Sequence, residues 1–292
     1  MSDNRKRLTI PGLAQAKRDG RRLAMISVPD YPMARWAEQA GADMVVVGDS
    51  LGMTVYGHDN TLPVTVDQMV AHTRAVRRGA PDTFCLVSMP YGSYATPDVA
   101  VTNALRLMKE GDADAVKMQG GREKSTVIRA IAQAGVPVMS HLGMCPHLMH
   151  FYGGFKLQGR TAAEALALVE DGRAVEAAGA IGFEIEAVPA RVASAIDAAV
   201  SVFTFGIGAG SACTGQILLG ADLLGAFDAF KPKFAKRYAD MNSVALGAFE
   251  EYVRDVRGGA FPDADHSYAM NPDEEARLDA VLGPAGTGGL GR

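Results

Sequence analysis

The sequence predicts a single (β/α)8 barrel, and three observations favour that fold class. The chain has 292 residues, which suits one barrel of about 250 residues with short extensions. Short apolar runs alternate with segments that have the apolar spacing of helices, as expected for successive β-then-α units. No Pro-, Gly- or Ser-rich linker divides the chain, so we expect one domain over residues 1–292. An open doubly wound sheet is the alternative fold.

Seven apolar runs have the length and composition of buried strands. They are "LAMISV" (23–28), "DMVVVGD" (43–49), "TFCLVSM" (83–89), "AVKMQ" (115–119), "VPVMSHL" (136–142), "GFEIEAV" (182–188) and "SVFTFGIG" (201–208). An eighth strand is expected around "GQILLGADLL" (215–224), which completes the number that closes the barrel.

The segments between these runs have the pattern of amphipathic helices. Several carry apolar residues at i, i+3, i+4 and i+7 and end in glycine, as helices commonly do. Thr65, Thr96 and Thr161 stand where N-caps are expected, and Glu164 completes a capping box with Thr161.

Both ends of the chain extend beyond the predicted barrel. Residues 1–21 form a basic N-terminal arm, and residues 233–258 have the pattern of a C-terminal helical extension. The small, Gly-rich residues 283–292 are expected to be a disordered tail.

Composition excludes several classes of function. The net charge of −4 and the pI near 5.9 give no bulk attraction to nucleic acid. No window approaches about 18 uninterrupted apolar residues, and the basic N-terminal run lacks the apolar core of a signal peptide. The three cysteines have no metal or redox spacing, so we expect free thiols in a cytoplasmic protein.

Polar residues stand at the ends of the predicted strands, where barrel enzymes place their chemistry. Because a charge is costly to bury unless it is paired or used, polar residues on several converging strands predict a pocket. These residues are Asp49, Ser50, Ser88, Lys117, Gln119, His141 and Glu186.

Each candidate also has a purely structural explanation. Asp49 suits a βα turn, and the Lys117 side chain could extend to the edge of its strand. His141 could be a core histidine whose hydrogen bonds are satisfied. Glu184 and Glu186 share one strand face, which would be an exposed face if the strand were half buried.

Two further segments carry weaker signals. "GIGAGSACTG" follows a predicted strand as phosphate loops do in some barrels, but it has no lysine, and tight backbone packing explains it better. His147 and His150 are three residues apart and would share a helix face, where a metal site is conceivable.

Long segments of the chain carry a resemblance to a known family. Residues 8–268 resemble ketopantoate hydroxymethyltransferases, through "VVVGDSLGMTVYGHDNTLPVTVDQMVAHTRAVRRGAP", "GGFKLQGR", "IEAVP", "GIGAG" and "KPKFAKRY". The resemblance implies a barrel of the phosphoenolpyruvate mutase and isocitrate lyase type. It also implies a homo-oligomer, often a decameric ring of barrels.

The resemblance implies an enzyme of pantothenate biosynthesis. Such an enzyme transfers a hydroxymethyl group from 5,10-methylenetetrahydrofolate to 3-methyl-2-oxobutanoate and forms 2-dehydropantoate. By position, Asp49 matches a Mg2+ ligand, Ser50 a substrate contact, and Glu186 the base that removes a proton from C3. Lys117 and His141 match residues that bind the oxo acid, and Mg2+ would act as a Lewis acid on its oxygens.

Two positions depart from the family pattern in a way that concerns the metal. Ser88 stands where the family has an aspartate, and Gln119 where it has a glutamate. Ser88 is therefore kept as a substrate contact, and Asp49 remains the one carboxylate of three. Mg2+ would then bind more weakly, because it prefers carboxylate and water oxygens.

Several interpretations of this departure stay open. The oxo acid could bind without metal, held by Lys117 and His141, or a softer ion could bind near His147 and His150. The alternative activity is a metal-weak or metal-independent aldolase or lyase on another 2-oxo acid. The alternative of another class is a pseudo-enzyme that binds a ligand or partner without turnover.

Overall fold

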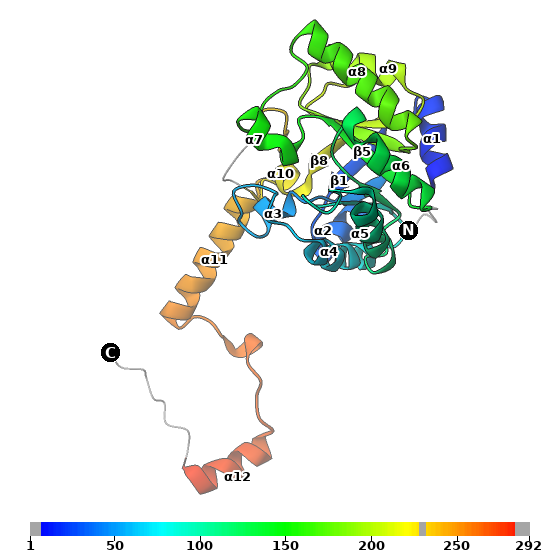
Figure 1. Cartoon of the computed structure of the whole chain (residues 1–292). Helices are drawn as coiled ribbons and strands as arrows, with labels where there is room; N and C mark the ends of the chain where they lie inside the picture. Colours follow the sequence, from blue (N-terminus) through cyan, green and yellow to red (C-terminus); the bar gives the residue numbers. More distant parts are fainter. Residues whose placement is uncertain (1–6, 228–231, 284–292) are drawn as a thin grey trace. The chain divides into compact units, whose positions relative to one another are not determined.

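Eight parallel strands close into a barrel in the computed structural model, which describes residues 7–227 and 232–283 (Figure 1). The strands follow one another around the barrel in sequence order, and β8 pairs with β1. The (β/α)8 barrel is therefore confirmed and the open sheet is wrong. The strands are β1 (Leu23–Ser27), β2 (Met44–Val47), β3 (Phe84–Ser88), β4 (Ala115–Lys117), β5 (Val138–Gly143), β6 (Gly182–Glu186), β7 (Phe203–Ile207) and β8 (Gly215–Leu219).

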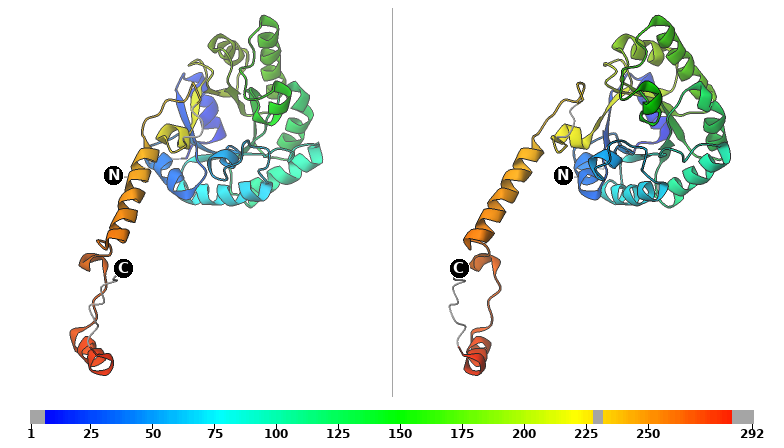
Figure 2. Two further views of the ribbon diagram at one scale, coloured as in Figure 1. Left: turned by 90° about the vertical axis from the view of Figure 1, so that its left-hand side faces the viewer. Right: turned by 60° about the vertical axis from the view of Figure 1, so that its left-hand side comes forward.

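Helices surround the strands as an outer layer (Figure 2). They are α1 (Ile10–Arg18), α2 (Tyr31–Gln39), α3 (Leu51–Thr54), α4 (Val66–Gly79), α5 (Pro97–Lys109), α6 (Ser125–Gln133), α7 (Met149–Tyr152), α8 (Ala162–Ala177), α9 (Ala190–Ala199) and α10 (Gly220–Leu224). Short 3-10 turns, η1 (Arg122–Lys124) and η2 (Pro146–Leu148), precede α6 and α7.

The predicted N-caps begin three of these helices. Thr65, Thr96 and Thr161 each accept a hydrogen bond from a backbone N–H of the first turn. Glu164 completes the capping box of α8, and Gln68 forms a second box in α4. The side chains thus satisfy N–H groups that the helix itself leaves unpaired.

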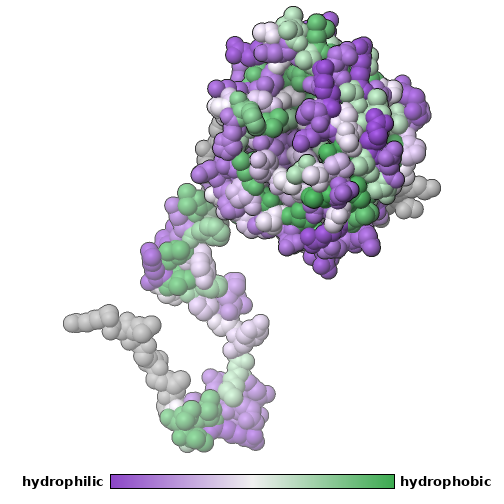
Figure 3. Space-filling model, in the orientation of Figure 1, coloured by the Kyte–Doolittle hydropathy of each residue, from purple (hydrophilic) through white to green (hydrophobic). Residues whose placement is uncertain are grey.

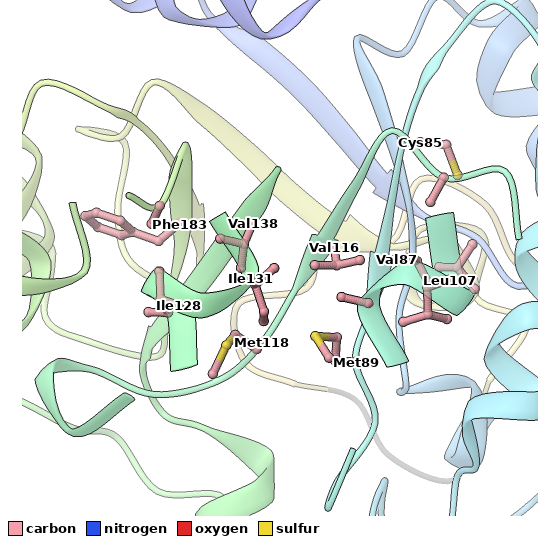
Figure 4. Packing of buried hydrophobic residues seen from close by; sticks show 14 of the residues in the cluster. Cys85, Val87, Met89, Leu107, Val116, Met118, Ile128, Ile131, Val138 and Phe183 are labelled. Atoms are coloured by element: carbon pink, nitrogen blue, oxygen red, sulfur yellow. The ribbon is translucent and has the colours of Figure 1, made fainter. Parts of the chain in front are cut away.

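Strands such as β2 and β3 are buried on both faces, which explains their nearly continuous apolar sequence. Outward residues pack beneath the helices, and Figure 4 shows Ile128 and Ile131 of α6 beside Val138 of β5. Inward residues such as Phe203 and Phe205 fill the barrel interior. Burial of each such side chain contributes about 1.5–3 kcal/mol, so the core holds the strand ends in fixed positions.

The C-terminal unit, residues 241–292, has helices of its own. The helical C-terminal extension is confirmed by α11 (Met241–Gly258), followed by η3 (Ala264–His266) and α12 (Pro272–Leu282). Apolar side chains lie on the surface of α11, and Phe249 and Tyr252 are among the exposed ones. Figure 3 shows hydrophobic and hydrophilic residues side by side on this unit.

The domain boundaries stay predictions. In the expected arm over residues 1–21, Leu13 and Ala16 of α1 join the interior core. The expected tail over 283–292 lies outside the described residues from residue 284 onward. Among the helices that the structure describes, none is long and apolar enough to cross a membrane.

Candidate functional site

A cavity of about 310 Å3 lies where the carboxyl ends of the strands meet. Parallel strands in a closed barrel bring these ends to one rim, so residues far apart in the sequence face the same space. Six of the seven predicted site residues line the cavity: Asp49, Ser50, Lys117, Gln119, His141 and Glu186. Ser88, the seventh, pairs in register with Lys117 and is 2% exposed.

Lys117 and Glu184 form a buried ion pair inside the barrel. The Lys117 Nζ lies 2.6 Å from the Glu184 Oε2, and both side chains are almost fully buried. Burial alone would raise the pKa of Glu184, but Lys117 and His141 lower it to about 2. Burial would lower the pKa of Lys117, yet Glu184 and Asp49 raise it above its usual value. Both groups are therefore charged at neutral pH.

His141 lies between two glutamates of the neighbouring strand β6. Its Nε2 is 3.2 Å from the Glu186 Oε2 and 3.0 Å from the Met144 carbonyl oxygen. Its Nδ1 is 3.3 Å from the Glu184 Oε2, at ion-pair distance but without the alignment of a hydrogen bond. Burial would lower the pKa of His141, but Glu184 and Glu186 raise it to about 9. The ring is then an imidazolium that links the two carboxylates.

Asp49 forms a hydrogen bond with His147, a residue far from it in the sequence. The Asp49 Oδ2 lies 2.6 Å from the His147 Nε2, and the His147 Nδ1 contacts the Tyr94 hydroxyl. The backbone N–H of His147 donates to the Gln119 Oε1 at 2.9 Å. Burial would raise the pKa of Asp49, but the bond to His147 and the nearby Lys117 lower it.

Several buried polar atoms of the site lack a hydrogen-bond partner among the described residues. They are the hydroxyl oxygens of Thr61 and Ser88, the Glu184 Oε1 and the His141 Nδ1. Thr61, Glu184 and His141 also line the cavity. An unpaired buried polar group costs about 1–3 kcal/mol, so these atoms favour a polar ligand in the cavity.

The donor set around Asp49 does not fit the Mg2+ site that the resemblance implies. Within residues 7–227 and 232–283, no group of three His, Cys, Asp or Glu side chains is placed to hold a metal ion. Asp49 and Gln119 each direct an oxygen to His147, and Ser88 is neutral. A softer ion shared by His147 and His150 does not fit either, because His147 is buried and His150 is exposed.

The Gly-rich segment after β7 serves packing. Gly208 has a φ of +62°, which favours glycine, and a Cβ there would lie 2.6 Å from a ring carbon of Phe234. Gly208 therefore allows Phe234 to reach the cavity, which it lines. This agrees with tight backbone packing and not with a phosphate loop.

Sequence reasoning missed two residues of the site, Tyr94 and Asp222, and it considered His147 only as a metal ligand beside His150. His147 and Tyr94 complete the surroundings of Asp49, and Asp222 of α10 lines the cavity with its carboxylate. Tyr94 and His147 follow predicted strands within a few residues, and Asp222 lies inside the segment expected to contain the eighth strand, just after the observed end of β8. That position was the available signal, but it does not show which distant side chains meet.

Comparisons with known proteins agree with the fold and identify relatives. The family model for ketopantoate hydroxymethyltransferase matches residues 7–264. The 3-methyl-2-oxobutanoate hydroxymethyltransferase 1 of Methylibium petroleiphilum is 50% identical over 270 residues, covering 92% of each chain. The 3-methyl-2-oxobutanoate hydroxymethyltransferase of Thermus thermophilus is 46% identical over 262 residues, covering 90% of this chain and 100% of its own.

Solved structures with low sequence identity share the barrel. Phosphonopyruvate hydrolase matches with a TM-score of 0.58 at 16% identity, over 94% of this chain and 98% of its own. A 2,3-dimethylmalate lyase, a member of the PEP mutase/isocitrate lyase superfamily, matches with a TM-score of 0.57 at 18% identity, over 97% and 98%. These likenesses confirm the predicted type of barrel and concern the fold alone.

Proposed function

Since the chain belongs to the ketopantoate hydroxymethyltransferase family, we propose that it transfers a hydroxymethyl group from 5,10-methylenetetrahydrofolate to 3-methyl-2-oxobutanoate. The product is 2-dehydropantoate, an intermediate of pantothenate biosynthesis. The observation that carries the proposal is the row of charged groups Lys117, Glu184, His141 and Glu186 along one wall of the cavity. It supplies a base together with fixed cations for an anionic intermediate.

The first step is removal of the C3 proton of the oxo acid by Glu186. The C3–H bond breaks, its proton passes to the Glu186 carboxylate, and its electron pair forms an enolate with the neighbouring carbonyl. Such a proton is too weakly acidic for a carboxylate base unless the enolate is stabilised. Lys117 and the His141 imidazolium are fixed and buried donors that stabilise the negative oxygen.

The second step forms the new carbon–carbon bond. The electron pair at C3 attacks the methylene carbon of the donor, and both carbon–nitrogen bonds of that carbon break in the overall reaction. Water supplies the oxygen of the hydroxymethyl group, and tetrahydrofolate leaves with its nitrogens protonated. The proton held by Glu186 is available for one of these nitrogens.

No step is assigned to a metal ion, because the residues around Asp49 do not fit one. In the proposal, Ser50 contacts the oxo acid, the ionised Asp49 accepts from His147, and the charge that a divalent cation would neutralise is carried by Lys117 and His141. The Asp49–His147 bond supports this assignment, since it already occupies one oxygen of the carboxylate.

Two measurements on the purified protein test the proposal. We expect formation of 2-dehydropantoate from the two substrates, and exchange of the C3 proton of 3-methyl-2-oxobutanoate in deuterated water. Absence of both would overturn the proposal and favour a pseudo-enzyme that binds without turnover. C3 exchange without formation of 2-dehydropantoate would support enolate formation. It would contradict 5,10-methylenetetrahydrofolate as the one-carbon donor.

The Asp49–His147 bond also favours a second candidate function. A metal-independent aldolase or lyase on another 2-oxo acid would use the same base and the same cations. It would show C3 exchange that survives EDTA, together with carbon–carbon bond cleavage or formation that needs no folate.

Assembly and location belong to the same proposal. We propose a cytoplasmic homo-oligomer, as in the ring assemblies that the resemblance implies. Exposed apolar side chains on α11, such as Phe249, Tyr252 and Val256, support an interface there. Light scattering that gives the mass of one chain would overturn it.

A further inference from the structure

Asp222 lies across the barrel from the charged groups described above. It follows β8, whereas Lys117 ends β4, and these two strands are opposite one another in a closed ring of eight. Both residues line the same cavity. The cavity therefore has acidic groups on two opposite sides, and its volume of about 310 Å3 leaves room beside a five-carbon oxo acid.

The Asp222 side chain is largely buried and lines the cavity. The residue is 5% exposed, and no described residue donates a hydrogen bond to its side chain, although its backbone carbonyl accepts one from Gly225. Burial raises the pKa of Asp222, and Arg237 opposes that shift only in part. A buried carboxylate that faces a cavity favours a ligand with N–H donors.

Aromatic residues that line the same cavity favour a flat ligand. Phe155, Phe227 and Phe234 line the cavity, and Gly208 provides the space that the Phe234 ring needs. Aromatic side chains stack on planar rings. Lys233 also lines the cavity and is exposed, so its ammonium group is available to a negative group at the mouth.

We infer that Asp222, Phe234 and Lys233 form the subsite for the one-carbon donor, with Asp222 binding the pteridine ring. The ring presents its N3–H and 2-amino group along one edge, two parallel donors that match a carboxylate. Phe234 stacks on the ring, and Lys233 pairs with the carboxylates of the glutamate tail. This inference rests on the proposed function, since it concerns the second substrate of the same cavity.

Replacement of Asp222 separates donor binding from oxo-acid chemistry. In Asp222→Asn, we expect the KM for 5,10-methylenetetrahydrofolate to rise on the order of 10- to 100-fold, because a charge-assisted pair is lost. The KM for 3-methyl-2-oxobutanoate and the folate-free C3 exchange should stay within about twofold. Asp82→Asn, at an exposed acid before β3, is the matched control and should change none of these values.

Direct binding of tetrahydropterin gives the second measurement. In anaerobic calorimetry, we expect the wild-type protein to bind tetrahydropterin and Asp222→Asn not to bind it. If Asp222→Asn does not fold, Phe234→Leu replaces it and should weaken the binding of tetrahydropterin. Lys233→Ala should weaken tetrahydrofolate but not tetrahydropterin. Wild-type protein that fails to bind tetrahydropterin, or Asp222→Asn with an unchanged donor KM, overturns the inference. Loss of product and C3 exchange in the wild-type protein would instead overturn the proposed function.

Discussion

Asp49 and His147 form a buried hydrogen bond of 2.6 Å between the end of β2 and the turn after β5. The two residues are 98 positions apart, and both are at most 6% exposed. The imidazole takes an oxygen of the carboxylate that the resemblance assigns to Mg2+. His147 also receives support from Tyr94 and Gln119. The chain itself therefore supplies hydrogen-bond partners on the His147 side of Asp49, while Asp49 also lines the cavity.

Chelation of divalent metals tests this network most simply. We expect the C3 exchange of 3-methyl-2-oxobutanoate to change by less than about twofold after EDTA treatment, because Lys117 and His141 supply the positive charge. Exchange would be followed by proton NMR in deuterated water. Complete inactivation by EDTA, with recovery on added Mg2+, would contradict the prediction and show that the network opens to a metal.

Restoring the two missing carboxylates should create a metal site. We expect Ser88→Asp with Gln119→Glu to raise the affinity for Mg2+ by about tenfold or more, since Mg2+ binds through carboxylate oxygens. Titration calorimetry measures the gain in Mg2+ affinity. The control is Ser88→Asn with Gln119 unchanged, because asparagine and glutamine have the shapes of aspartate and glutamate without their charge. An unchanged affinity in the double variant would mean that these positions no longer point at a common ion.

The fold was readable from the sequence to a greater extent than the site. Apolar runs such as "MVVV" predict buried strands because parallel barrel strands are covered on both faces. Strand ends then predict most of the cavity lining, since a closed barrel brings them together. The period of two also places Glu184 and Glu186 on one face. The sequence pattern does not predict which side chain each charged residue contacts. That pairing depends on the register between strands and on the paths of loops that are far apart in the sequence.

The missed contacts illustrate this limit. Glu184 meets Lys117 only because β5 lies between their strands and brings the two side chains into the barrel at the same level. His147 reaches Asp49 through a short 3-10 turn whose direction no local pattern specifies. Contacts made by residues in loops, such as His147, are therefore seen only in the three-dimensional structure.

Breaking the Lys117–Glu184 pair should destabilise the barrel strongly. Lys117→Met leaves the Glu184 carboxylate buried without its main partner, and we expect a loss of about 3–5 kcal/mol. The double variant Lys117→Met with Glu184→Leu removes both charges and should recover part of that loss. Denaturant unfolding followed by circular dichroism measures the difference. A double variant that is less stable than Lys117→Met would contradict the expected coupling.

Stability should depend on pH through His141. Its pKa is raised from 6.5 to about 9 by the two glutamates, so its contribution is fully present below pH 6.5 and is lost as the pH rises through 9. Glu184 has a pKa lowered from 4.5 to about 2, so its contribution is present above pH 4.5 and is lost as the pH falls through 2. The melting temperature should therefore be highest between about pH 4.5 and 6.5.

A variant of His141 separates this effect from other titrating groups. His141→Gln keeps a polar side chain of similar size but cannot become an imidazolium. We expect its melting temperature to fall less than that of the wild-type protein between pH 6.5 and 9, in the same buffers. Parallel curves for the two proteins would assign the pH dependence to other residues.

Glu184 and Glu186 of β6 allow a direct comparison of which glutamate removes the C3 proton. Glu186 ends the strand and is partly exposed to the cavity, whereas Glu184 is buried against Lys117. Glu186→Gln removes the proton acceptor and keeps its shape, so C3 exchange should fall about 10^2- to 10^4-fold with the oxo acid still bound. Glu184→Gln leaves the acceptor in place and alters only the surroundings of Lys117 and His141. We expect a smaller loss of exchange, with lower thermal stability. Deuterium exchange at saturating oxo acid compares both variants directly, and a larger loss in Glu184→Gln would assign the base to Glu184 instead.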